Sequence, residues 1–162
     1  MRRLSVITLI FALFIPLLVG GISAALSRQG MSMYATMEKP PLSPPAWVFS
    51  VAWTILYLMM GLAAYFVIES EHNTQAKAMA LIIYALQLAM NFMWSIMFFN
   101  WGAYLAAFVW LIVMWAMVIV CAVRFYSISK IATYLFIPYI LWLTFAAYLN
   151  MGAYVLQMRS KL

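Results

Sequence analysis

Three polar residues lie inside one long apolar run, where they could serve chemistry or binding. Gln87, Asn91 and Ser95 recur every four residues, so they form one stripe along a helix, and Trp94 lies beside that stripe. Buried amides are costly unless they find hydrogen-bond partners. The stripe can therefore either join neighbouring helices or line a cavity. For Gln87 both interpretations stay open, whereas Asn91 beside Trp94 favours a cavity wall.

Aromatic residues at helical spacing indicate what such a cavity would bind. Trp53 and Tyr57 are one helical turn apart in an earlier apolar run. Tryptophans at the ends of apolar runs commonly lie at the membrane surface, which suits Trp47 and Trp101, but Trp53 lies deeper. The last apolar run carries one broad face with aromatic and polar members: Tyr139, Trp142, Ala146, Leu149 and Asn150. Walls of this kind suit a flat, largely apolar ligand.

The sequence has few residues that could serve conventional catalysis or bind a metal ion. The one histidine, His72, and the three carboxylates, Glu38, Glu69 and Glu71, all lie in polar connections, and Cys121 is the one cysteine. The sequence therefore predicts no metal site, no axial-histidine haem, no acid–base pair and no disulfide within the chain. An ion-coupled pump normally keeps an ionisable residue in the membrane, and none is found in the apolar runs. We expect no required cofactor.

The composition places most of the surface in lipid. The chain has 162 residues, of which 69% are hydrophobic and 7% are charged, whereas soluble domains carry about 25% charged residues. The mean hydropathy is +1.04. The net charge of +6 comes from basic residues scattered near the ends of apolar runs. This pattern favours contact with anionic lipid headgroups and argues against a nucleic-acid partner.

Five charge-free runs are long enough to cross a membrane as helices. The sequence predicts a single domain, an all-α bundle of five transmembrane helices, at residues 4–26, 46–68, 78–99, 102–123 and 131–156. The first run also resembles a signal peptide, but its apolar part is longer than such segments usually have, so we expect a retained helix. Residues 100 and 101 barely separate the third and fourth helices, which should be antiparallel neighbours. The basic residues do not decide the orientation.

The long connection at residues 27–45 contains four of the six prolines, Pro40, Pro41, Pro44 and Pro45. Each proline fixes its own φ and restricts the preceding residue to extended geometry. We expect Ser43 to cap the second helix, with Pro44 at its first position. So stiff a connection is predicted to act as a lid that holds one pose over a pocket.

Weaker patterns leave several roles open. Small residues four apart on the first helix, Gly20 with Ala24 and Gly21 with Ala25, permit close packing within the bundle or in a dimer. Trp110 and Trp115 could simply face lipid. Leu149, Tyr154 and Arg159 satisfy a loose pattern proposed for cholesterol contact, which also matches many membrane helices by chance.

Three segments resemble the tryptophan-rich sensory protein family, which is also called the translocator protein or peripheral-type benzodiazepine receptor family. They are "EKPPLSPPAWVFSVAWTILYLMMGLAAY", "LQLAMNFMWSIMFF" and "IPYILWLTFAAYLN", and they occur in order over the second, third and fifth predicted helices. The paired prolines followed by Trp-x-x-x-Tyr, and the Gln-x-x-x-Asn-x-x-Trp pattern, are the specific parts of this match.

The resemblance implies a five-helix bundle, often a homodimer, that binds porphyrins such as protoporphyrin IX, cholesterol-like lipids and benzodiazepine-site drugs. It implies that the loop after the first helix covers the pocket. By motif match, Trp53 and Trp142 correspond to tryptophans tied to porphyrin binding and its light-driven breakdown. Tyr34 matches a loop tyrosine near the pocket, and Asn91 and Trp94 match its lining on the third helix. With Tyr57 and Ala146, these residues form the predicted ligand site.

Some positions depart from the family pattern. Many members have glycine where this chain has Ala46, and many carry an acidic residue in the fourth helix near the position of Trp110. A role that depends on that acid is therefore not expected here, and an inward-pointing Trp110 would fill part of the pocket. The sterol pattern is spaced differently from the compact mammalian form, so cholesterol handling does not follow from it.

Three functions are consistent with these residues and with the resemblance. The first is a multi-pass protein of a bacterial cell membrane that binds and senses porphyrins. The second is an enzyme that degrades porphyrin under light and oxygen, with Trp53 and Trp142 as candidate catalytic residues and the ligand supplying the photochemistry. The third is a transporter of sterol, lipid or tetrapyrrole, although no internal repeat of the kind that many transporters use is visible.

Overall fold

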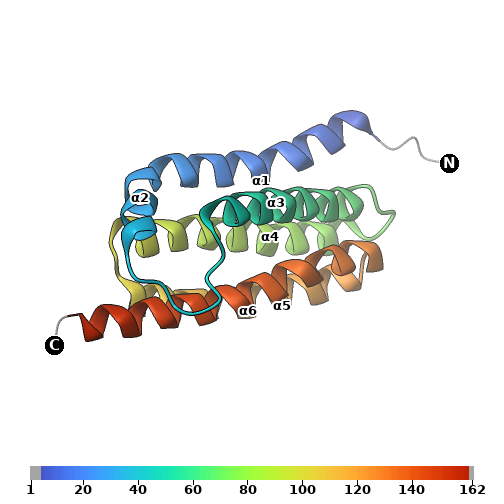
Figure 1. Cartoon of the computed structure of the whole chain (residues 1–162). Helices are drawn as coiled ribbons and strands as arrows, with labels where there is room; N and C mark the ends of the chain where they lie inside the picture. The colour runs from blue at the N-terminus through green and yellow to red at the C-terminus, as the bar shows by residue number, and fades with distance from the viewer. Residues whose placement is uncertain (1–4, 161–162) are drawn as a thin grey trace.

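The computed structural model describes residues 5–160 and is helical throughout that range except for its connections. The elements are α1 (Val6–Leu26), α2 (Arg28–Thr36), α3 (Ala46–Ile68), α4 (Thr74–Ser95), the π-helix η1 (Ile96–Asn100), α5 (Tyr104–Tyr126) and α6 (Lys130–Arg159). Figure 1 shows three tiers, with α1 on one side, α3 and α4 in the middle, and α5 and α6 on the other side. Five of the described helices, with η1 counted as the end of α4, are long and apolar enough to cross a membrane. The predicted five-span helical bundle is confirmed.

Side-chain caps account for several helix starts. The Oγ of Ser5 accepts from the backbone N–H of Thr8, and the Asn73 side chain accepts from two backbone N–H groups of the first turn of α4. The Oγ of Ser129 does the same for α6. Because Asn73 caps α4, that helix begins at residue 74, earlier than the predicted residue 78. The predicted start of the first helix, residue 4, lies outside the described residues.

The connection at residues 27–45 is only partly a loop, because α2 occupies its first half. Met31, Tyr34 and Ala35 share one face of α2 at helical spacing, and this face lies toward the bundle. The proline-containing part then turns at Leu42, whose φ is 65°. The prediction that residues 27–45 form a loop was therefore wrong for residues 28–36, which form α2.

The predicted cap of α3 was also wrong. The hydroxyl of Ser43 donates to the carbonyl oxygen of Pro40 at 2.7 Å and closes the turn of the connection. Pro45 holds the N-cap position in extended geometry, with φ −62° and ψ 154°, and makes no side-chain cap. Because Pro44 itself precedes a proline and is restricted to extended geometry, α3 begins only after the second proline pair, at Ala46.

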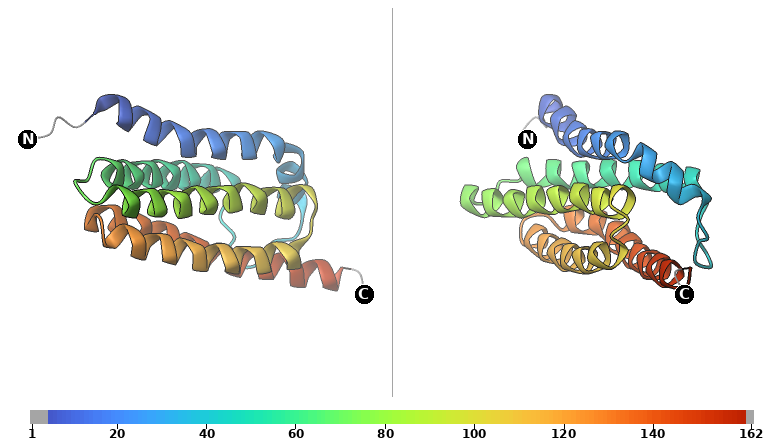
Figure 2. Two further views of the ribbon diagram at one scale, coloured as in Figure 1. Left: turned by 180° about the vertical axis from the view of Figure 1, so that it is seen from behind. Right: turned by 90° about the vertical axis from the view of Figure 1, so that its left-hand side faces the viewer.

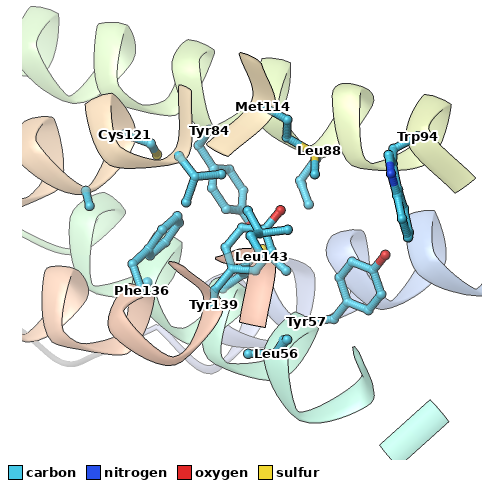
Figure 3. Close-up of a cluster of buried hydrophobic side chains, with 14 of the residues drawn as sticks. Leu56, Tyr57, Tyr84, Leu88, Trp94, Met114, Cys121, Phe136, Tyr139 and Leu143 are labelled. Carbon is cyan, nitrogen blue, oxygen red and sulfur yellow. The ribbon is translucent and has the colours of Figure 1, made fainter. Parts of the chain in front are cut away.

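The tiers are held by close helix packing. Gly61 of α3 lies against the backbone of α1, and a Cβ there would stand 2.5 Å from the carbonyl oxygen of Ala12. The two views of Figure 2 show α4 and α5 side by side, joined through η1. This agrees with the expectation that the third and fourth spans are antiparallel neighbours. The core between α3, α4, α5 and α6 is rich in aromatic rings, as Figure 3 shows around Tyr84, Phe136 and Tyr139.

Candidate functional site: an aromatic double cavity

The polar stripe of α4 forms an interhelical hydrogen-bond network. The Tyr57 hydroxyl donates to Oδ1 of Asn91 at 2.7 Å, and Nδ2 of Asn91 donates to the Tyr139 hydroxyl at 3.1 Å. The Tyr139 hydroxyl donates in turn to Oε1 of Gln87 at 3.0 Å, and Nε2 of Gln87 lies 3.7 Å from the sulfur of Met60. The network joins α3, α4 and α6, so both amides act between helices.

Asn91 lies one layer behind the cavity walls described below. It is 1% exposed and bonded to two tyrosines, and neither cavity is lined by it. One of those tyrosines, Tyr57, does line a cavity. Figure 3 shows Tyr57 and Tyr139 among the labelled side chains, below the yellow-green helix α4. Asn91 therefore orients a wall residue through a hydrogen bond and does not itself face the cavity.

An inner cavity lies under α2 and the proline segment. Its volume, counted as the space that the centre of a water molecule can occupy, is about 90 Å³. Its walls come from α2, the connection, the start of α3, the end of α4 with η1, and α6; the residues used below are Tyr34, Trp94, Phe98, Ala146, Leu149 and Asn150. The indole N–H of Trp94 donates to Oδ1 of Asn150 at 3.1 Å. Asn150 also donates to the Tyr104 carbonyl at 2.7 Å, so the Trp94 ring is held from α6.

A lateral cavity adjoins the inner one between α1, α3 and α4. Its volume on the same measure is about 240 Å³, and its walls include Trp53, Tyr57 and Ser95. Met31, Phe49, Trp94 and Phe99 line both cavities. Gly20 of α1 faces the Tyr57 ring, so this small residue serves packing within the bundle, whereas Gly21 faces open space. The two cavities are compartments of one aromatic site with Trp94 between them.

Trp53 is the centre of the aromatic cluster. Its ring centre lies 5.6 Å from Tyr57, 6.4 Å from Trp94, 6.2 Å from Tyr139 and 6.5 Å from Trp142. These separations are within the range of favourable ring contacts. Trp142 lines neither cavity; it packs behind Trp53, and its indole N–H is buried without a hydrogen-bond partner among the described residues. The cluster thus extends from the cavity wall to α6.

Tyr34 closes the inner cavity from above. Its ring meets Phe98 and Phe99 edge to face at 5.1 and 5.8 Å. Burial, and secondarily the neighbouring Tyr104, raises the pKa of the Tyr34 phenol above its ordinary value of 10.0. The phenol is therefore neutral at physiological pH and can pack on the rings below it.

The proline segment is attached to α6. Pro40 packs on Gly152, where a Cβ would stand 2.5 Å from the Cβ of the proline. The Tyr148 hydroxyl donates to the Pro41 carbonyl at 2.9 Å. Pro44 lines the inner cavity directly, whereas Pro45 caps α3. The four prolines thus divide between attachment to α6, the cavity wall and the start of a helix.

The tryptophans of α5 join neighbouring helices. The indole N–H of Trp110 donates to the Met90 carbonyl of α4 at 2.9 Å, and that of Trp115 donates to Oγ1 of Thr144 of α6 at 3.0 Å. Both rings are half-buried, so they pack on neighbouring helices as well as facing outward. Trp110 lines neither cavity and does not fill the pocket.

The residues of the sterol pattern are dispersed. Leu149 is 4% exposed and lines the inner cavity. Tyr154 is half-buried, and Arg159 is exposed at the end of α6. Five residues along a helix turn the side chain by about 140°, so the three do not share one face.

Some site residues were not identified from the sequence. Phe49 lies one turn before Trp53 at the same spacing that identified Trp53 and Tyr57, so this signal was available. Phe98 and Phe99 lie in the π-helix, whose altered register moves them off the α-helical stripe. Within residues 5–160, no group of three or more histidine, cysteine or carboxylate side chains could hold a metal ion.

Comparison with known proteins agrees with these features. The model of the TspO/MBR family matches residues 12–156. The chain belongs to the TspO/MBR family. It is 33% identical to the tryptophan-rich protein TspO of Chlorobaculum tepidum over 90% of this chain and 92% of that one. It is 40% identical to the tryptophan-rich sensory protein of Cereibacter sphaeroides, over 74% and 73% of the two chains.

A eukaryotic relative is also similar over most of the chain. The translocator protein of Bos taurus is 34% identical over 84% of this chain and 82% of its own. The family match, residues 12–156, includes the three middle spans and most of the first and last, so this TspO/MBR protein is an integral, multi-pass membrane protein. The resemblance stated from the three motif segments is thereby confirmed.

Proposed function

We propose that this TspO/MBR protein binds porphyrins, with protoporphyrin IX as the expected ligand, in the joined inner and lateral cavities. The observation that carries the proposal is the continuous aromatic lining, in which Trp94 stands between the two cavities and Trp53 contacts four further rings. A flat macrocycle has two broad faces that gain from ring contact. Ala146 leaves room on the α6 side, where a larger side chain would project into the inner cavity.

Binding requires the cover of the inner cavity to move. Ligand pockets for molecules of drug size usually hold roughly 300–1,000 Å³, and the inner cavity alone, at about 90 Å³, is far below this. The lateral cavity of about 240 Å³ brings the joined space only to the lower end of that range, which leaves little room for a whole macrocycle. We therefore assign to α2 and the proline segment the role of a lid that rises when the macrocycle enters and closes over it afterwards.

A fluorescence titration tests the proposed function. Protoporphyrin IX added to the protein in nanodiscs should quench tryptophan emission saturably, because several indoles lie at or near the cavities. The Trp53→Phe, Trp142→Phe double variant should bind more weakly and show less quenching. The matched control is Trp47→Phe, because Trp47 is 68% exposed and should leave the affinity unchanged. Linear quenching without saturation, equal to that of empty nanodiscs, would refute porphyrin binding.

A second candidate function is light-dependent porphyrin degradation. The favouring observation is the line of indoles Trp94, Trp53 and Trp142, whose neighbouring ring centres are 6.4 and 6.5 Å apart. Such a line can supply electrons to a photoexcited ligand, with dioxygen as the oxidant, and needs no acid–base residue. Illumination should then convert porphyrin to a defined product, and conversion should stop in the Trp53→Phe, Trp142→Phe variant. Bleaching at the same rate in both proteins would exclude this activity.

The partners and location follow the family. We propose a homodimer in a bacterial cell membrane, in line with the bacterial relatives, with membrane lipid as the surrounding solvent. The mass of the protein in detergent, measured by light scattering, tests the dimer. Sterol contact and transport of sterol, lipid or tetrapyrrole stay secondary proposals, which transfer assays between vesicles would test.

A further inference from the structure

Lys39 is the one charged side chain that lines either cavity within the described residues 5–160. It stands at the rim of the inner cavity, next to Pro40, and is half-buried. Residues that precede proline are restricted to extended geometry, so the backbone fixes where this lysine leaves the proline segment. The rest of the inner wall is neutral and mainly aromatic or aliphatic.

The positive charge of Lys39 faces neutral groups. Its Nζ donates to the Ala35 carbonyl at 3.0 Å and lies 5.9 Å from the centre of the Tyr34 ring. The adjacent carboxylate, Glu38, is exposed and is not part of the cavity wall. An ammonium group has three donors and a flexible stem. It can therefore turn from the Ala35 carbonyl to an anion that arrives at the rim.

We propose that Lys39 selects ligands that carry a carboxylate on an apolar ring system. The aromatic body would lie against Trp94 and Trp53, and the carboxylate would accept a charge-assisted hydrogen bond from Nζ at the rim. This inference rests on the proposed function and narrows it. Among porphyrins, those with free propionate groups are bound in preference to those whose acid groups are esterified.

The competing explanation for a lysine at this depth is snorkelling, in which the apolar stem packs on protein and the amine reaches the headgroup region. A snorkelling lysine would have the same effect on the binding of a charged ligand and of a neutral one. Selectivity between an acid and its neutral ester separates the two explanations, because only direct pairing depends on the charge of the ligand.

The test compares protoporphyrin IX with its dimethyl ester in the full-length protein in nanodiscs, by tryptophan quenching corrected with empty nanodiscs. The variants are Lys39→Met, which keeps the apolar stem, and Lys39→Arg, which keeps the charge. The matched control is Lys130→Met, because Lys130 also lies over a tyrosine ring, at 5.8 Å, but at the start of α6, far from the cavities.

We expect the wild-type protein to bind the acid about tenfold more tightly than the ester, as a hydrogen bond between charged groups warrants. Lys39→Met should remove that preference by weakening the acid alone, Lys39→Arg should retain most of it, and Lys130→Met should not change it. If acid and ester bind equally well to the wild type, or if Lys39→Met weakens both alike, the assignment of Lys39 is overturned while porphyrin binding stands. If neither compound binds saturably, both proposals fail.

Discussion

Replacing Gly152 by alanine should loosen the lid, and the size of the effect follows from the contact with Pro40. A Cβ at residue 152 would stand 2.5 Å from the Cβ of Pro40 and 2.8 Å from its Cγ. Carbon atoms rest at about 3.5–4.0 Å, so the proline must retreat by about 1 Å. The adjacent hydrogen bond from Tyr148 to the Pro41 carbonyl, 2.9 Å long, depends on the same placement.

The expected consequence is faster release of bound porphyrin. Losing one hydrogen bond of this kind costs about 1 kcal/mol, which corresponds to about a fivefold increase in the dissociation rate if the lid must open for release. The helix itself should not suffer, because alanine is a better helix former than glycine by about 1 kcal/mol. Stopped-flow measurement of protoporphyrin IX release, by recovery of tryptophan emission, gives the rate.

The control for this variant is Val109→Ala. Val109 also lies within a membrane helix, α5, but it is 57% exposed and lines neither cavity. The alanine should therefore gain helix preference without any change in release. Limited proteolysis of the segment at residues 37–45 should be faster for Gly152→Ala alone. If both variants release porphyrin at the wild-type rate, the segment is not a lid over the ligand.

Three further predictions concern the frame of the site. Asn91→Leu should lower the free energy of unfolding in detergent by about 1–3 kcal/mol, because it leaves the buried Tyr57 hydroxyl without its partner and removes the bond from Asn91 to Tyr139; a stability equal to wild type would mean that the network is not needed. Gly61→Val should destabilise the protein strongly by separating α1 from α3, whereas Gly21→Val should not, and equal melting temperatures would contradict the close contact. The raised pKa of Tyr34 means that its neutral form is favoured in the folded protein, so its contribution is full below pH 10 and is lost as the pH rises through the raised value. Porphyrin affinity should thus be flat between pH 6 and pH 9, apart from ligand titration that Tyr34→Phe would share, and a drop in that range specific to wild type would refute this.

The five spans could be read from the sequence because charge-free runs of this length have few alternatives in a membrane. The position of Asn91 shows the limit of that reading. Its burial followed from its place in an apolar run, but its role depended on the hydroxyls of Tyr57 and Tyr139, which come from two other helices. The spacing of residues along one helix does not indicate which other helix supplies the hydrogen-bond partner.

Local signals were also misjudged where two physical effects competed. The prolines at residues 40–45 are typical of a loop, but residues 28–36 before them form a helix, with Met31, Tyr34 and Ala35 on the face toward the bundle. Ser43 has the chemistry of a helix cap, but its hydroxyl instead donates to the Pro40 carbonyl within the turn, and the N-cap position of α3 falls on Pro45. Phe98 and Phe99, which lie in the π-helix, pack on Tyr34 of α2, and the sequence around them does not indicate this contact between distant segments.

The most direct test of the account is the structure of the protein with protoporphyrin IX bound. We predict that the macrocycle lies against Trp94 and Trp53 across both cavities, under α2 and the proline segment, with a propionate near Nζ of Lys39. A macrocycle bound on the lipid-facing surface, with the two cavities empty, would contradict the central claim.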